Sequence, residues 1–333
     1  MMRQKELRQQ NDGSKKKDIL DIFRALSALL IFLYHSLIFG EHGFMGVEIL
    51  MVLCGFTAML SSSRLEHRNE FLVKRIVKVV PLYWALTLVM FVLILIMPSL
   101  SIMSVASVPD LVRSMLFIPF TNAKGVKAPI LSLGWMLEYQ MLIFILFAIA
   151  IAVSKNFYRY RGVLASALLG VFMLISKDTF PLEFIYGIAL FYLYDGVGGI
   201  KERNTASTVI SFVISALLFA ACIITEAHPE IERQYLLGIL VTLMIALPLF
   251  MASVKMPKAV GVLASCSYEF ILIEYFTTAF FKAICADRPM VIKVLVLIVI
   301  LAVTFVGSWI VHLLYDKFCT VILDRVLPSR RDN

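Results

Sequence analysis

One stretch of the chain decides the class of fold: residues 21–39, DIFRALSALLIFLYHSLIF. It is an apolar run that nevertheless carries Arg24 and His35, and ionisable side chains in hydrocarbon usually mark a functional site. On a helix, the eleven steps between them return His35 to within roughly 20° of Arg24 and carry it about 16 Å further along the axis. We therefore expect the two side chains to face one groove at two depths of a membrane helix.

The composition of the whole chain agrees with a membrane location. Its 333 residues are 60% hydrophobic and 16% charged, with a mean hydropathy of +0.89, values that exclude a water-soluble domain of this size. We predict an all-α, polytopic membrane protein of about ten transmembrane helices. The predicted spans are 19–39, 46–63, 79–97, 131–153, 162–176, 182–195, 206–225, 235–254, 260–284 and 290–314. The fifth and sixth are the shortest and could form a re-entrant pair.

The lysines and arginines set the predicted orientation. Most of the 31 fall in segments that share one side of the membrane with the N-terminus, which predicts that both termini are cytoplasmic. The same bias explains the net charge of +8 without nucleic acid as a partner. We predict cytoplasmic tails at 1–18 and 315–333 around a membrane domain at 19–314. The five cysteines have no CxxC spacing, so neither a disulfide framework nor a metal site is expected.

Polar residues within the spans fall at two depths. An outer layer holds four candidate site residues: His35, Glu48, Glu138 and Glu274. An inner layer holds four cations: Arg24, Lys74, Arg75 and Lys78. A histidine near an acid is the usual arrangement for proton transfer, and a basic entrance suits phosphates. The two layers together predict a long ligand with phosphates at one end and a reactive group at the other, as in a coenzyme A thioester.

Four segments also carry a family resemblance. They are Arg24 and His35 with ten residues between them, 46–56 with Glu48 and Cys54-Gly55-Phe56, 71–83 with Lys74-Arg75-x-x-Lys78 and Pro81-Leu-Tyr83, and 131–140 with Ser132 and Glu138. In order and spacing, these segments closely resemble the acyltransferase 3 family of integral membrane acyltransferases. Further along, the resemblance rests on the hydrophobic layout and on 267–274, from Ser267-Tyr268 to Glu274.

This resemblance implies an activity. Family members take an acyl group, most often acetyl, from cytoplasmic acetyl-CoA or another short acyl-CoA. They pass it to a hydroxyl of an envelope polysaccharide or lipid-linked sugar, at the bacterial cell membrane. The resemblance implies that Arg24 and His35 are the central catalytic pair and links Lys74, Arg75 and Lys78 to donor binding. Because some members carry a fused extracytoplasmic domain, it also implies either direct transfer or a separate extracytoplasmic partner.

The chain departs from the family pattern at three points. Cys54 stands where the family commonly has serine, and the basic motif contains fewer arginines, which reduces bidentate phosphate contacts. Glu274 stands where a histidine is often seen, so the acceptor contact or the proton route differs.

Each candidate residue also has a structural explanation. His35 could be a packing histidine, Arg24 an interfacial anchor, and the basic cluster a consequence of topology alone. Glu48 and Glu138 could satisfy helix ends. We favour a site role for all of these, whereas Glu274 fits both explanations equally.

The leading functional hypothesis is therefore an O-acyltransferase in which His35 acts as general base or carries the acyl group in a relay. The alternative is a transporter or flippase for an anionic or glycan-linked cargo, although paired broken helices are not evident in the sequence. A lipid-linked glycosyltransferase is a third hypothesis, with Glu230 and Glu232 as the only outer acidic pair.

Overall fold

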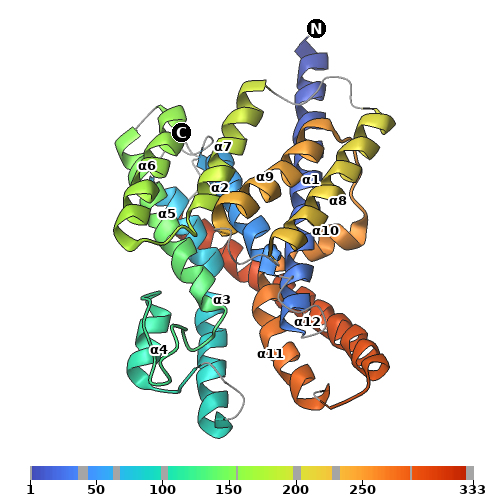
Figure 1. The fold of residues 1–333 in the computed structure, drawn as a ribbon. Coiled ribbons are helices and arrows are strands. Elements are labelled where there is room, and N and C mark those ends of the chain that lie inside the picture. The colour runs from blue at the N-terminus through green and yellow to red at the C-terminus, as the bar shows by residue number, and fades with distance from the viewer. Residues whose placement is uncertain are drawn as a thin grey trace. The chain divides into compact units, whose positions relative to one another are not determined.

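The chain forms a helical protein (Figure 1). The computed structural model describes residues 2–36, 44–62, 68–98, 104–154, 157–197, 204–226, 233–285 and 287–327. These ranges contain twelve helices, and one isolated bridge joins Thr121 to Lys127 in a segment between two helices. The helices are α1 (Met2–His35), α2 (Met45–Ser62), α3 (Arg68–Ile96), α4 (Val108–Met115), α5 (Gly134–Ser154), α6 (Tyr158–Ser176), α7 (Leu182–Val197), α8 (Thr205–Glu226), α9 (Arg233–Met251), α10 (Lys258–Ser265), α11 (Ser267–Cys285) and α12 (Met290–Val326).

The prediction of an all-α membrane protein is confirmed. Each of the ten predicted spans coincides with a helix, except that 260–284 is divided between α10 and α11. In the described ranges, six helices are long and apolar enough to cross a membrane, and the pair α10–α11 makes a seventh if its 78° bend lies within one span. α7 and α9 are apolar but shorter than the roughly 20 residues of a perpendicular span.

Helices run through both predicted domain boundaries. α1 begins at Met2, so the segment expected as a tail continues the first membrane helix, and Lys16 lies over the ring of Tyr194 at 5.1 Å. α12 extends to Val326, and its 37 residues exceed what a bilayer requires.

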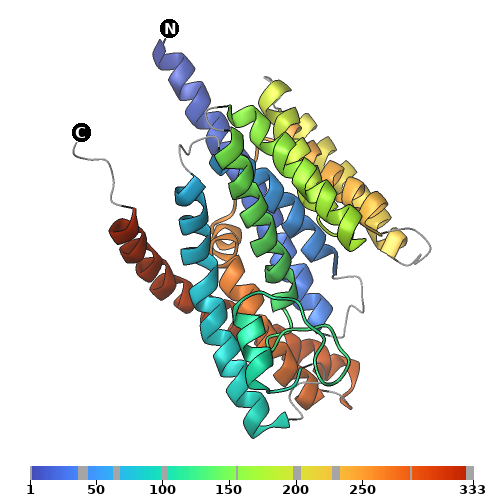
Figure 2. The same ribbon diagram turned by 90° about the vertical axis from the view of Figure 1, so that its left-hand side faces the viewer.

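The chain divides into two compact units. Unit 1 comprises Met1–Ser61 and Ser166–Ile271, and unit 2 comprises Ser62–Ala165 and Leu272–Asn333. In unit 1, α8 and α9 lie side by side (Figures 1 and 2), and α9 also packs on α7 and α1. α1 packs further on α10.

Two glycines allow α2 and α7 to cross closely in unit 1. A methyl group on Gly55 would run into the backbone of Phe184 and Gly187, and one on Gly187 would run into the carbonyl oxygen of Val52. Small residues let membrane helices approach with their backbones in contact. This crossing is the structural reason for glycine in the segment Cys54-Gly55-Phe56.

Unit 2 is organised around α3, which packs on α4, α5 and α12 (Figure 2). Pro81 lies inside α3 and has no N–H to donate to the carbonyl of Val77. α12 satisfies that carbonyl, because the hydroxyl of Tyr315 donates to it at 3.0 Å and the thiol of Cys319 at 3.4 Å. The proline of the family motif is therefore accommodated by polar groups of the last helix, as hydrocarbon surroundings require.

Candidate functional site

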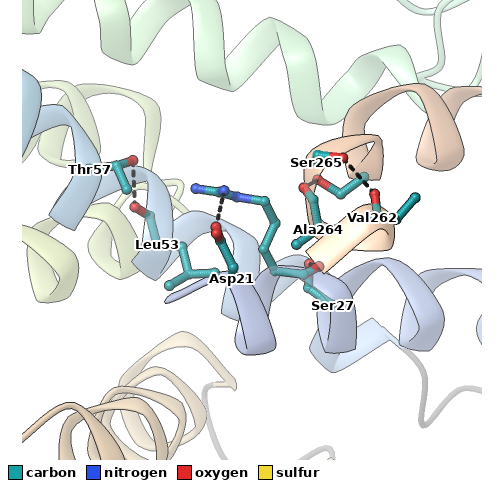
Figure 3. A network of polar contacts seen from close by, with 9 residues as sticks. Asp21, Ser27, Leu53, Thr57, Val262, Ala264 and Ser265 are labelled. Carbon is teal, nitrogen blue, oxygen red and sulfur yellow. Dashed lines mark hydrogen bonds and ion pairs between the residues drawn. The ribbon is translucent and has the colours of Figure 1, made fainter. Parts of the chain in front are cut away.

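Arg24 forms an ion pair within α1. Its Nη1 donates to Oδ1 of Asp21 at 2.6 Å (Figure 3), with the Asp21 side chain 10% exposed and that of Arg24 33% exposed. The remaining N–H groups of this guanidinium have no hydrogen-bond partner among the described residues. An ionised side chain with unused donors in a membrane span is suited to hold a ligand.

The ion pair also sets the position of the guanidinium along the axis of α1. Asp21 precedes Arg24 by three residues, so the bond draws the guanidinium towards the N-terminal end of α1. Asp21 and His35 are separated by 14 residues in the continuous helix, or about 21 Å along its axis. Arg24 and His35 share one helix, as predicted, but in this conformation the guanidinium is far from the imidazole.

The hydroxyl groups labelled in Figure 3 bond to helix backbones. Three of them donate to carbonyl oxygens of their own helices: Ser27 to Arg24 at 3.0 Å, Thr57 to Leu53 at 2.8 Å and Ser265 to Val262 at 2.7 Å. Asp21 is therefore the anionic group that the described part of unit 1 provides to Arg24.

His35 is the last residue of α1 and is half-buried. Its ring lies edge-on to Tyr34 at 5.1 Å, and Tyr34 in turn meets Phe44, just before α2, at 5.8 Å. The hydroxyl of Ser36 closes the helix by donating to the carbonyl of Leu33 at 2.7 Å.

Glu48 is completely buried on α2. By the helical period it shares a face with Val52 and Gly55, the residues that contact α7. Gly46, which lies on the opposite side of the helix, is instead the residue packed against Ser27 of α1. The face of α2 that carries Glu48 thus packs on α7.

The structure adds Glu183 to the acids found from the sequence. It is completely buried in the first turn of α7, one turn before Gly187, and neither carboxylate oxygen has a hydrogen-bond partner among the described residues. Glu48 thus lies two turns before Gly55, and Glu183 lies one turn before Gly187. The only sequence signal for Glu183 was an acid at the start of an apolar run, which is also what an ordinary helix N-terminus shows.

The three cations of the basic motif on α3 differ in their surroundings. Lys74 pairs with Glu70 at 2.5 Å, and Arg75 lies over the rings of Phe71 and Phe144 at 5.4 and 4.9 Å. Lys78 is exposed and has no partner among the described residues. Lys78 is therefore the cation of this motif most available to an anionic ligand.

Glu138 lies on α5 of the same unit and is 8% exposed. One turn earlier, Gly134 packs against the ring and hydroxyl of Tyr83, a residue of the basic-motif segment. Glu138 interacts electrostatically with Tyr83 and with Lys127 in the preceding loop. At the contact between α3 and α5, Arg75 thus lies near Phe144, and Tyr83 lies near Glu138.

Glu274 is completely buried on α11, where it accepts a hydrogen bond from Thr278 at 3.3 Å. Its neighbour Tyr275 is hydrogen-bonded to the side chain of Ser132. Ser132 belongs to the segment 131–140, as Glu138 does. The hydrogen bond therefore connects that segment to α11, which carries Glu274.

The predicted site residues are thus divided between the units. Unit 1 carries Arg24, His35 and Glu48, whereas unit 2 carries Lys74, Arg75, Lys78, Glu138 and Glu274. No group of three or more potential metal ligands is present in the described part of the chain.

Comparisons with known proteins establish the family. A family model described as an acyltransferase domain matches residues 17–313. The chain belongs to the acyltransferase 3 family, which confirms the resemblance found in the motifs. It is 31% identical over 124 residues to the exopolysaccharide production protein ExoZ of Rhizobium meliloti (strain 1021). That match covers 35% of this chain and 38% of the relative. No solved structure matches the chain.

Proposed function

We propose that this protein is a membrane O-acyltransferase of the bacterial cell membrane. It moves an acyl group, expected to be acetyl, from cytoplasmic acyl-CoA to a hydroxyl of an envelope polysaccharide or lipid-linked sugar. The observation that carries the proposal is the family match over 17–313, which includes every predicted site residue. The name of ExoZ, which refers to exopolysaccharide production, supports a glycan acceptor.

His35 is the proposed centre of the reaction. In direct transfer, the imidazole takes the proton of the acceptor hydroxyl as its oxygen attacks the thioester carbonyl. The carbon–sulfur bond then breaks, and the proton passes to the leaving thiolate, so that an ester and a free thiol are formed. In the relay, the imidazole nitrogen attacks the thioester carbonyl, the carbon–sulfur bond breaks and coenzyme A leaves as its thiol with the proton of the imidazole. The acceptor hydroxyl then attacks the acyl-imidazole, its proton returns to the imidazole and the ester is released.

The buried acids are proposed to support the imidazole and the acceptor. Glu48 belongs to the same unit as His35, whereas Glu138 and Glu274 belong to unit 2. A carboxylate that accepts a hydrogen bond from an imidazole fixes its tautomer and stabilises its protonated form. Glu274 replaces the histidine often seen in the family, so we assign it to an acceptor hydroxyl or to proton transfer.

The cations are proposed to hold the donor. Lys78 is unpaired among the described residues and Arg75 is held on two aromatic rings, so both present positive charge for the phosphates of coenzyme A. Arg24 contributes the unused N–H groups of its guanidinium.

The test is transfer from radiolabelled acetyl-CoA by the purified protein in vesicles, with an envelope glycan fraction as acceptor. We expect His35→Ala to lose activity by at least a hundredfold, the lower range for removing an acid–base group. His312→Ala, a histidine substitution in the membrane helix α12, is the matched control. Label retained on denatured wild-type protein but absent from His35→Ala favours the relay. Full activity of His35→Ala contradicts both schemes.

The bend between α10 and α11 is the one observation that favours a transporter, because broken membrane helices often form substrate sites. Uptake of a glycan-linked cargo into vesicles without acyl-CoA would support that function. Coenzyme A binding at the cytoplasmic face, with no such uptake, would support the acyltransferase.

A further inference from the structure

We propose that the apolar side of α4 is a membrane-contacting surface, which the acyl chains of the bilayer cover, so that α4 lies in lipid beside α3. This inference concerns where the helix lies and is independent of the acyl-transfer reaction. It follows from the distribution of side chains on α4, from its contact with α3 and from the exposed side of that helix.

α4 exposes apolar side chains and buries polar ones. Val108, Val112 and the C-cap residue Leu116 are 65%, 49% and 59% exposed, whereas Asp110 is 7% and Ser114 is 0% exposed. The exposed positions recur every four residues, and the two buried ones lie on the opposite side of the helix. A helix at the surface of a water-soluble protein has the reverse distribution. Hydrocarbon around α4 would remove the cost of exposing these apolar side chains.

The buried polar side of α4 has partners within the protein. The hydroxyl of Ser114 donates to the carbonyl of Asp110 at 2.7 Å and accepts from the backbone N–H of Ile130 at 2.9 Å. The carboxylate of Asp110 lies 3.6 Å from the guanidinium of Arg113, which is exposed. A long arginine side chain reaches the headgroups while its stem stays on apolar surface. α4 thus meets the requirement that polar groups in a membrane have internal partners.

The contact between α4 and α3 lies within the part of α3 expected in the membrane. The indole N–H of Trp84 donates to the carbonyl of Met115 at 2.7 Å, and α4 runs alongside the C-terminal half of α3 (Figures 1 and 2). Trp84 precedes Ile96, the last residue of α3, by twelve residues, or about 18 Å along the axis. The basic motif lies towards the other end of α3. The last turn of α4 therefore lies beside the predicted span 79–97.

The exposed side of α3 identifies lipid as the occupant. Four exposed residues recur at the spacing of one helix face: Trp84, Leu88, Val92 and Leu95. α3 is long and apolar enough to cross a membrane, so this face meets acyl chains. Trp84 belongs to that face and also bonds to α4. The exposed side of α4 is therefore continuous with a surface that lipid covers.

The position of α4 also affects the candidate site of unit 2. Phe117, which follows α4, stacks on the ring of Tyr83 at 5.0 Å. Ile130, which bonds to Ser114, directly precedes the segment 131–140. Lipid contact at α4 therefore helps to hold both of these connections next to α3.

The experiment places a nitroxide label on single introduced cysteines, with the full chain reconstituted into phosphatidylcholine vesicles. Collisions of the label with oxygen, which concentrates in hydrocarbon, are compared with collisions with a water-soluble nickel chelate. We expect the oxygen-to-nickel ratio of Val112→Cys and Leu116→Cys to match that of Val92→Cys on α3. It should be several-fold higher than that of Ala123→Cys, a control in the exposed polar stretch after α4. Unsubstituted protein, treated with the same label, measures any signal from the native cysteines.

Two results of this experiment overturn the inference. A ratio for Val112→Cys equal to that of Ala123→Cys would show that water covers α4. Low collision rates with both reagents would show that protein covers it, either a second copy of this chain or another partner.

A charge substitution supplies a second test. Val112→Asp should lower the unfolding temperature in the same vesicles, because a charged side chain in lipid is unfavourable. Val112→Leu keeps an apolar side chain and should leave the unfolding temperature unchanged. Equal unfolding temperatures of the two variants would contradict lipid contact at α4.

Discussion

Gly55 of α2 and Gly187 of α7 meet with their backbones in contact: a methyl group on Gly55 would lie 3.0 Å from the Cα of Gly187. Glu48 lies two turns before Gly55 and Glu183 one turn before Gly187, and both are completely buried. The crossing therefore helps to hold two acids in the interior of unit 1.

We predict that Gly187→Ala destabilises the protein. The obstacle to the added methyl is the carbonyl oxygen of Val52, which moves only with the backbone of α2, so the cost should be about 1–3 kcal/mol. Thermal unfolding in detergent measures it. Gly196→Ala is the control, because Gly196 lies on the same helix with open space around it and should gain stability from alanine's helix propensity. Equal stability of the two variants would contradict the close crossing.

We predict that Glu183→Leu raises stability. A buried carboxyl group without hydrogen-bond partners costs about 1–3 kcal/mol, and leucine of similar size removes that cost. Glu183→Gln keeps a polar group of the same shape and should leave stability near the wild-type value. The measurement is the shift in unfolding temperature, and a fall for Glu183→Leu would show that the carboxylate has a partner in the folded protein.

We predict that Lys78 matters more for the donor than Lys74 does. Lys74 is engaged by Glu70 at 2.5 Å, whereas Lys78 is exposed and unpaired in the described part of the chain. Lys78→Ala should raise the KM for acyl-CoA by about tenfold, as loss of a charged hydrogen bond does, and Lys74→Ala by less. Glu70→Gln should lower the KM, since it releases Lys74. A higher KM for Glu70→Gln would argue against phosphate binding by Lys74 and Lys78.

We predict that Tyr315→Phe destabilises unit 2 through Pro81. The phenol donates to the carbonyl of Val77 that the proline leaves without its helical partner, so its loss should cost about 1 kcal/mol. In a Pro81→Ala background the helix supplies an N–H, and Tyr315→Phe should then cost less. A double-mutant cycle on unfolding free energies tests this coupling. Additive effects would show that Tyr315 does not compensate for the proline.

Much of the fold was predictable from local pattern. Apolar runs long enough for a membrane must form helices, because backbone groups in hydrocarbon need internal partners, and all ten runs are helical. The shared helix of Arg24 and His35 followed from their place in one run. The bend at Cys266 did not, because residues 260–284 are continuously apolar enough to read as one span.

The candidate site was less predictable, because several of its contacts join helices that are far apart in the sequence. Asp21 stood in the stretch that defined the first helix, but an acid near a helix start has several ordinary explanations. Glu183 likewise matched the pattern of an ordinary acid in the first turn of a helix. Tyr83 contacts Gly134, and Tyr275 contacts Ser132. In each pair the two residues are dozens of positions apart, so helical periodicity does not predict the contact.

By itself, the sequence determined that this is a helical membrane protein, where its helices lie and which family motifs they carry, since hydropathy and spacing are local properties of the chain. Only the tertiary structure decided which groups meet across helices: Tyr315 with the carbonyl of Val77 and Tyr275 with Ser132. The reason is physical. In a low-dielectric interior the energy of a charge or an unused carbonyl depends on the group in contact with it, and only folding sets that contact.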